Sequence, residues 1–339
     1  MRKRYLLIFV FCWVAMCLLL RSKLSGQETT TRIQAAETSS PCDIVAVYAG
    51  PLSFESGKTY YVHPEALENV TQITLEGLLG TTIHFLAPLK GDVTYWASSR
   101  DDSGVLNVVD CVDLTLTGLD IENTRVYTPG NIILESSCAV NISASSVEIR
   151  HSKLKGNGKS ALAVHSGSEV LITDSEISAY YFEMLVAASD LTAERVILNQ
   201  LNPQVPDSHA AIWVSSSHRH DSTNVLYENT NVVLTDVTFN LESGRAIVSG
   251  NGSYTTMSNV TLTNPTYNFT DPTHGIATFH ENYNSITVVL NDPIEGLVDY
   301  VTTPNTGFGR FVNYYTPATR PNSNSPIVVD GVSSEDIQL

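Results

Sequence analysis

The chain has few cysteines, few basic residues beyond its first segment and almost no helical hydrophobic periodicity. Only 5 of its 339 residues are Cys, and none form a Cys-x-x-Cys pair, which excludes a zinc ribbon or a dithiol redox motif. The sequence also has no P-loop, no dinucleotide fingerprint and no Gly-x-Ser-x-Gly motif. The common nucleotide-binding and α/β-hydrolase sites are therefore excluded.

Basic side chains are scarce in the body of the chain. The whole sequence holds 19 Lys and Arg against 35 Asp and Glu, with a formal net charge of -16, and five of the basic residues fall within residues 1–26. An acidic body repels nucleic acid and anionic lipid at long range. We therefore expect no nucleic-acid partner, and a polyanionic sugar is disfavoured unless a local basic patch exists.

Residues 1–26 combine a basic cluster with an apolar run over residues 5–20. The run is short for a membrane span and lacks a small-x-small cleavage site, and Arg21 and Lys23 close it. We expect a signal anchor that crosses the membrane through residues 5–20, giving a single-pass type II protein with a lumenal or extracellular body. A cleaved signal peptide, giving a secreted protein, is the alternative.

Five Asn-x-Ser/Thr sequons follow, and they matter only if the body enters a secretory lumen. The predicted glycosylation sites are Asn69, Asn141, Asn251, Asn259 and Asn268. Beyond residue 26 the cysteines are Cys42, Cys111 and Cys138, so at most one internal disulfide forms. Cys42 would be free to join two chains, and buried or free thiols are the other reading.

Val, Ile and Thr dominate between turns of Asn, Asp, Gly and Ser, which indicates an all-β protein. Residues 27–44 are polar and read as a stalk, residues 45–315 form the body, and residues 316–339 read as a loosely ordered tail with one strand at Ile327–Val329.

One short sequence repeat recurs along the body at unequal intervals. Its copies begin at Leu116, Ile149, Ile172, Ala193, Leu234 and Met257. The third position of each copy is Gly118, His151, Asp174, Arg195, Asp236 and Asn259. The sixth position is always apolar: Ile121, Leu154, Ile177, Leu198, Phe239 and Leu262. A unit this short cannot bury its own apolar face, so the copies are expected to stack as coils, with a left-handed bend at the third position and insertions leaving sideways.

This pattern resembles the right-handed parallel β-helix repeat of the pectate-lyase-like superfamily, with its apolar-x-Asn-x-x-apolar signature. The resemblance implies a solenoid over the body and says little about activity, because lyases, hydrolases, epimerases and adhesins share the fold. A β-sandwich is the alternative fold, but it does not predict a shared register with a bend at one position. If the coils are consecutive, Arg195 lies between Asp174 and Asp236 at the bend.

The resemblance also implies that ligands lie along the sheet that precedes the first turn. In that sheet we expect His165, Trp213, Ser215 and Ser249 to point outward. Trp213 is the best candidate for stacking on a sugar ring, with Ser215, Arg219 and Ser249 as further substrate-binding residues. The alternative is a Trp covered by the 200–210 loop.

If the protein cleaves its ligand, we expect histidines to transfer protons and lysines to neutralise charge. The candidate catalytic residues are His165, His209, His218, His220, Lys155 and Lys159. No cofactor is indicated, and no defined metal-ligand spacing supports a bound divalent cation.

Two hypotheses remain open from the sequence. In the first, a secretory-pathway or cell-surface protein binds a polysaccharide, and cleaves it as a lyase or hydrolase if it is an enzyme. In the second, the chain is a non-catalytic adhesion or structural scaffold glycoprotein. Convergence of His165, Trp213 and the 218–221 loop on one surface would favour the first.

Overall fold

The computed structural model describes residues 30–34, 44–48, 52–93, 103–126, 137–158, 160–201, 210–219, 225–241, 245–250, 258–269, 277–279, 284–289, 312–313 and 327–329. The described chain is built almost wholly of strands. Its one helix is the 3-10 helix η1 (Pro64–Leu67), and none of these residues form a helix long and apolar enough to cross a membrane. The proposed anchor over residues 1–26 lies outside the described residues.

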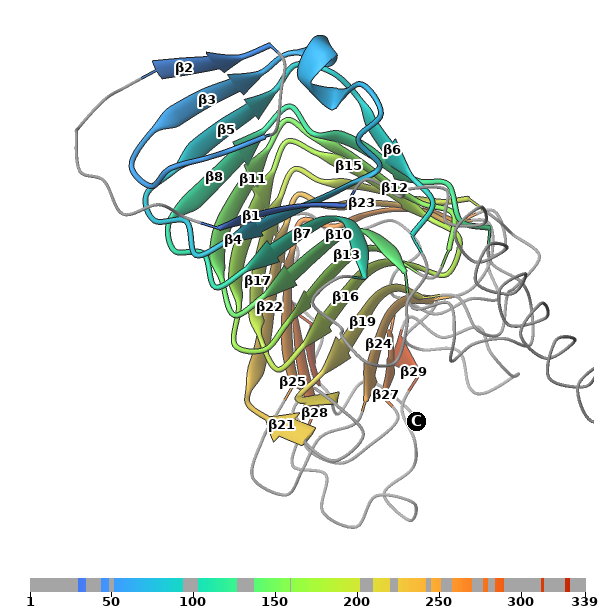
Figure 1. The fold of residues 1–339 in the computed structure, drawn as a ribbon. Helices are drawn as coiled ribbons and strands as arrows, with labels where there is room; N and C mark the ends of the chain where they lie inside the picture. Colours follow the sequence, from blue (N-terminus) through green and yellow to red (C-terminus); the bar gives the residue numbers. More distant parts are fainter. Residues whose placement is uncertain are drawn as a thin grey trace, which may run out of the picture.

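Three parallel sheets make up the body, and the chain visits them in turn (Figure 1). The first sheet contains β1 (Thr30–Gln34), β4 (Gln72–Glu76), β7 (Gly104–Val109), β10 (Cys138–Ser143), β13 (Ser160–His165), β16 (Phe182–Ala187), β19 (Ala210–Ser215), β24 (Arg245–Gly250), β27 (Ala277–Phe279) and β29 (Val312–Asn313). The second contains β2 (Ile44–Val47), β3 (Thr59–Val62), β5 (Thr82–Phe85), β8 (Leu114–Thr117), β11 (Ser146–Arg150), β14 (Glu169–Thr173), β17 (Asp190–Glu194), β22 (Thr230–Thr235), β25 (Ser258–Thr263), β28 (Asn284–Val289) and β30 (Ile327–Val329). The third contains β6 (Leu89–Gly91), β9 (Asp120–Asn123), β12 (Lys153–Gly156), β15 (Glu176–Ala179), β18 (Ile197–Gln200), β23 (Thr238–Leu241) and β26 (Thr266–Phe269).

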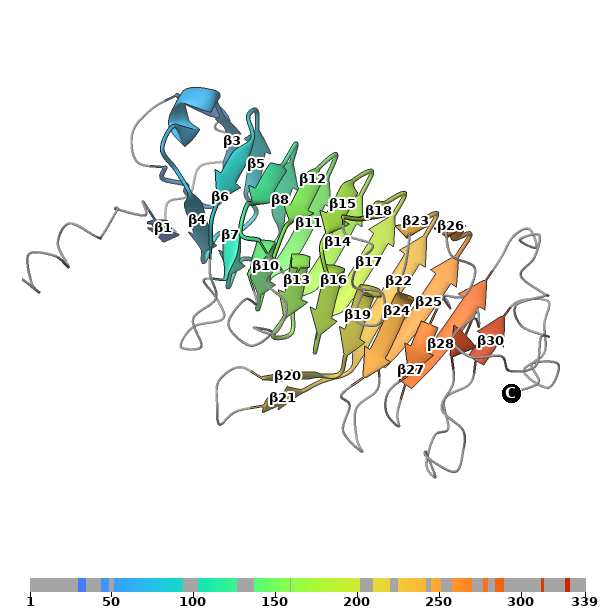
Figure 2. The same cartoon turned by 90° about the vertical axis from the view of Figure 1, so that its right-hand side faces the viewer.

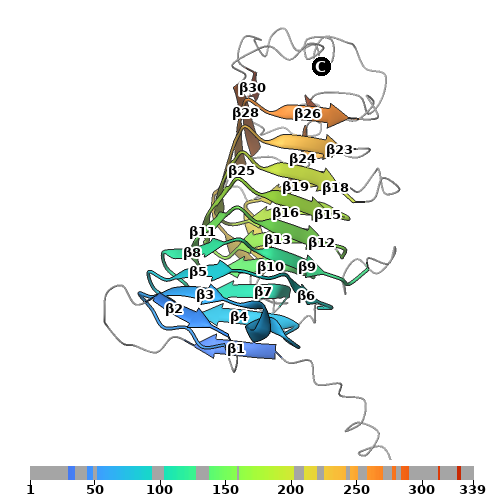
Figure 3. The ribbon, with the colours of Figure 1, turned by 90° about the horizontal axis from the view of Figure 1, so that it is seen from above.

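Successive coils lie one on the next in chain order, so each strand pairs with its counterparts in the neighbouring coils (Figures 2 and 3). This is the stacking predicted from the repeat, and it makes the chain a solenoid of parallel strands. Strand β1 shows that residues 30–34, within the predicted stalk, take part in the first sheet by pairing with β4. The predicted strand at Ile327–Val329 is confirmed as β30.

The register confirms the phase of the first five copies of the repeat. Leu116, Ile149, Ile172, Ala193 and Leu234 form one row in the second sheet. Ile121, Leu154, Ile177, Leu198 and Phe239 form one row in the third sheet, all at most 1% exposed. Rows like these supply the core, and burying each large apolar side chain stabilises the fold by about 1.5–3 kcal/mol.

The phase predicted for the sixth copy of the repeat is wrong. Leu262 pairs with Leu234, so it occupies the first position of its copy and not the sixth. The residue in the row of Phe239 is Tyr267, and the bend falls at Asn264 instead of Asn259. The alternation of apolar residues and Thr around Leu262 reads the same in either phase, and only pairing with the previous coil fixes it.

The bend between the second and third sheets is left-handed in each of these coils. Positive φ values of 49 to 66° occur at Gly118, His151, Asp174, Arg195, Asp236 and Asn264. His151 and Arg195 therefore adopt a conformation that usually favours Gly, Asn or Asp. The stacked pairing on both sides of the bend fixes it more strongly than the local residue preference does.

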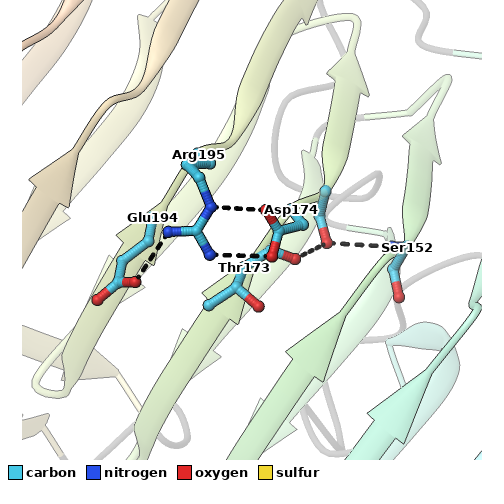
Figure 4. A network of polar contacts seen from close by, with 6 residues as sticks. Ser152, Thr173, Asp174, Glu194 and Arg195 are labelled. Atoms are coloured by element: carbon cyan, nitrogen blue, oxygen red, sulfur yellow. Dashed lines mark hydrogen bonds and ion pairs between the residues drawn. The ribbon is translucent and has the colours of Figure 1, made fainter.

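Arg195 forms the predicted ion pair with Asp174 of the preceding coil. Its Nε and Nη2 lie 2.7 and 2.9 Å from the two carboxylate oxygens, and Nη1 lies 3.4 Å from Glu194 (Figure 4). The guanidinium lowers the pKa of Asp174. The second expected partner, Asp236, instead accepts a hydrogen bond from Asn264 at 3.2 Å.

Buried hydroxyls connect the coils at the bend between the first and second sheets. The backbone amides of Cys111, Ser145, Ser168 and Ser189 donate in turn to the side chains of Ser145, Ser168, Ser189 and Thr230, at 3.0 to 3.3 Å. Each of these hydroxyls also donates to a carbonyl of its own coil. This hydroxyl ladder satisfies polar groups that would otherwise be costly to bury.

Candidate functional site

The first sheet carries a row of side chains that runs along the solenoid between the inward-facing core rows. In register, Asn107 pairs with Asn141, Asn141 with Ala163, Ala163 with Leu185, and Leu185 with Trp213. The neighbouring rows of Leu162 and Val164 lie in the core, as predicted. The row from Asn107 to Trp213 is therefore the outward face of the sheet, polar at one end and aromatic at the other.

Trp213 belongs to a small cluster outside the main core. Its ring centroid lies 5.4 Å from that of Phe182, which packs edge-on against Tyr181 at 4.4 Å. Phe182 and Ala210 are buried, whereas Tyr181, Leu185 and Trp213 are only partly buried. The cluster thus holds aromatic side chains that are only partly buried against a buried ring.

His165 lies in the outward row next to the one that contains Ala163 and Trp213, but it is not open to solvent. The side chain is 3% exposed, and Nε2 lies 2.9 Å from Oδ1 of Asn141. A carboxamide oxygen only accepts, so Nε2 donates this bond, and Nδ1 lies 3.0 Å from Oγ of Ser166. The histidine expected to face a ligand instead holds two coils together.

The burial of Asn141 argues against a glycan at its sequon. Asn141 is 1% exposed, so a glycan on its side-chain nitrogen would require the sheet to open. Asn69 and Asn268, in contrast, are exposed. Asn251 lies outside the described residues, and Asn259 lies in β25, where only its backbone is described.

The other predicted binding residues of this sheet behave differently from Trp213. Ser215 is 3% exposed, and its carbonyl accepts a hydrogen bond from Oγ1 of Thr230 at 2.7 Å. Ser249 pairs with Val214 in the register of β24, so its position belongs to the row of Val214 and not to that of Ser215. The predicted outward position of Ser249 is therefore wrong by one residue.

Lys155 lies on the third sheet and therefore does not join His165. Its Nζ is 2.9 Å from Glu122, whose other carboxylate oxygen is 2.8 Å from Nζ of Lys90. Asn157 also donates to Glu122 at 3.0 Å. These contacts lower the pKa of Glu122 to about 2, with the bond from Lys90 as the largest cause. The lysine proposed to neutralise a ligand's charge is already paired within the protein.

A hairpin carries the remaining described candidates. His218 and Arg219 lie in β20 (Ser217–Arg219), which pairs antiparallel with β21 (Val225–Tyr227). The hairpin begins directly after β19 and projects from the stack, as expected of an insertion (Figure 2). His209, His220 and Lys159 lie outside the described residues.

Glu183 is a buried residue that our sequence analysis did not single out. Its side chain is 0% exposed, within β16 and beside Phe182 of the aromatic cluster. The signal was present as one carboxylate inside the apolar run 180–188. Buried carboxylates are rare because desolvation is costly.

A row of asparagines marks the outer face of the third sheet. Nδ2 of Asn268 donates to Oδ1 of Asn240, and Nδ2 of Asn240 donates to Oδ1 of Asn199, both at 2.8 Å. Asn199 in turn donates to Glu176 at 2.9 Å. This asparagine ladder joins four successive coils on the surface.

Two further observations bear on the chemistry. Cys111 and Cys138 are free buried thiols, and burial raises their pKa values to about 11 and about 12. Among the residues with a described position, no group of three or more His, Cys, Asp or Glu side chains is arranged to hold a metal ion.

In comparisons with known proteins, no family model, no curated protein and no solved structure matches this chain.

Proposed function

We propose that this chain is a secretory-pathway or cell-surface protein that binds a polysaccharide on the outward face of its first sheet. The body is proposed to be a right-handed parallel β-helix of the pectate-lyase-like type. The winding of the chain through three parallel sheets supports this, and nearly all parallel crossovers are right-handed.

The observation that carries the proposal is the cluster of Tyr181, Phe182 and Trp213. Sugar rings present apolar faces that stack on aromatic side chains, and rigid aromatic groups lose little entropy on binding. Leu185 lies beside Trp213 in the register and widens the apolar surface along the solenoid axis. An extended glycan chain lying on this row would cross several coils.

Binding without cleavage fits the described groups best. Both ring nitrogens of His165 are used in hydrogen bonds, and Lys155 is paired with Glu122. A general acid or base must reach the proton that it transfers, and His165 is buried. Cleavage by a lyase or hydrolase mechanism would have to use other residues.

The leader and the sequons support the proposed location. A signal anchor over residues 5–20 would place the body in the lumen or outside the cell, and cleavage would release it. The exposed sequons at Asn69 and Asn268 suit such a compartment.

The test is a glycan array probed with the purified protein, together with a screen for unsaturated or new reducing-end products. We expect binding to a polysaccharide class without product formation. Product formation would show that the protein is an enzyme. If neither binding nor product formation is detected, the carbohydrate proposal is wrong.

The second candidate is a non-catalytic adhesion or scaffold protein. The hydroxyl ladder and the asparagine ladder favour it, because both join successive coils and stiffen the long axis. Absence of glycan binding together with high resistance to unfolding would support this alternative.

A further inference from the structure

Strand β2 (Ile44–Val47) forms the terminal strand of the second sheet. It pairs in parallel with β3 on one side, and its other edge meets no strand among the residues that the structure describes. The strand lies at the blue end of the solenoid in Figure 1. Within the described chain, the backbone donors and acceptors of this outer edge therefore have no strand partner.

The side chains of this edge alternate between two faces. Ile44 is 73% exposed and Tyr48, directly after the strand, is 57% exposed. Val45 and Val47 point the other way and pack, only partly buried, against the core. The end of the core is thus incompletely covered at the same edge.

Proteins usually protect such an edge with charge, proline or a bulge. Residues 44–48, with the sequence Ile-Val-Ala-Val-Tyr, contain no charged residue and no proline, and β2 pairs with β3 without a bulge. An unprotected apolar edge strand is a template for a further strand.

We propose that β2 pairs antiparallel with β2 of a second copy of this chain, about a two-fold axis at Ala46. In this register Ile44 of one copy faces Tyr48 of the other, and Val45 faces Val47. The contact is self-complementary, since each pair occurs twice. The contact would also cover the β2 end of the core in each of the two copies. This inference is independent of the proposed glycan binding.

A second copy fits this edge for two reasons. The strand is apolar at positions related by reversal about Ala46, so it matches itself. Each copy carries a formal net charge of -16, so two bodies repel at long range and need an uncharged contact, which this edge provides. Pairing of β2 with the opposite end of another copy would instead build an open polymer, and the experiment distinguishes the two.

Cysteine cross-linking tests the register in the full chain, with Cys12, Cys17 and Cys42 replaced by serine. Ala46→Cys is expected to give a disulfide-linked dimer on oxidation, because residue 46 faces itself across the axis. Ile44→Cys is the matched control on the same face, since the two copies of residue 44 would lie about 14 Å apart. The double variant Ile44→Cys, Tyr48→Cys is expected to restore the cross-link.

The oligomeric state gives a second readout, measured by light scattering after gel filtration. The unmodified chain is expected to be a dimer, and Ala46→Lys to weaken dimerisation at least about tenfold. Val233→Lys, on the outer face of the same sheet and 38% exposed, serves as the control that leaves the dimer intact. A monomer at all concentrations, a ladder of larger oligomers, or equal cross-linking by Ile44→Cys and Ala46→Cys would overturn the proposal.

Discussion

Nε2 of His165 in β13 donates a hydrogen bond to Oδ1 of Asn141 in β10, at 2.9 Å. This hydrogen bond joins a candidate catalytic base to the residue of a candidate glycosylation site. Both side chains are at most 3% exposed. The outward face of the first sheet is therefore closed at this point, and the partly open aromatic surface lies near Trp213.

The sequons should differ in occupancy according to this geometry. In protein made with its own leader in a glycosylating cell, we expect glycans at Asn69 and Asn268 and none at Asn141. Asn268 keeps one N–H after glycosylation, so it can still donate to Asn240. Glycopeptide mass spectrometry checks this, with Thr71→Ala and Thr270→Ala each removing one glycan. A glycan on Asn141 of the folded protein would contradict the account.

The two buried thiols should be inert. Burial raises the pKa values of Cys111 and Cys138 to about 11 and about 12, so little thiolate exists at pH 8, and solvent access is small. We expect no alkylation of either by iodoacetamide in the native protein and complete alkylation in denaturant. Rapid native labelling, read by mass spectrometry, would show that this part of the stack opens.

The hydroxyl ladder predicts a cost for removing one member. In Ser168→Ala the amide of Ser145 loses its acceptor, and the carbonyl of His165 loses a donor. Leaving buried groups unsatisfied should lower the free energy of unfolding by about 1–3 kcal/mol. Ser178→Ala, on the outer face of the third sheet, is the control. Equal denaturation midpoints for the two variants would argue against the ladder.

Glu122 predicts a pH-dependent stability. Its folded pKa is lowered from 4.5 to about 2, so its contribution is complete above pH 4.5 and is lost as the pH falls toward 2. Glu122→Gln should therefore lower the free energy of unfolding at pH 7 by about 0.5–1 kcal/mol, a small value because solvent screens the pairs. The difference from the unmodified protein should vanish near pH 2.

Glu65→Gln, at an exposed position of η1, serves as the charge-matched control for that series. A Glu122→Gln difference that is constant from pH 7 to pH 2 would show that the loss comes from packing and not from the carboxylate.

The coil, its bend and its core row could be predicted from the sequence. The sixth position of the repeat is always apolar, and the third is most often a residue that favours a left-handed bend. Even His151 and Arg195, which disfavour the bend, follow the repeat. The phase at Leu262 and Ser249 was wrong, since alternating patterns shifted by one or more residues look alike until pairing selects one.

The candidate site was predicted less well than the fold. Alternation correctly put His165 and Trp213 on one face, but alternation does not determine what covers that face. The burial of His165, the pairing of Lys155 with Glu122 and the burial of Glu183 all depend on contacts between residues far apart in sequence or in different coils. Such contacts leave little local signal, and only the single carboxylate in the apolar run 180–188 points to one of them.

The central claim is that the aromatic cluster on the first sheet binds a glycan, and a titration with matched variants tests it most directly. The glycan that gives the strongest array signal would be titrated into the unmodified protein, Trp213→Ala and Tyr61→Ala, the last on the outer face of the second sheet. We expect Trp213→Ala to weaken binding about tenfold to a hundredfold, as loss of a stacking aromatic does, and Tyr61→Ala to leave it unchanged. Equal affinity of Trp213→Ala and the unmodified protein would contradict the account.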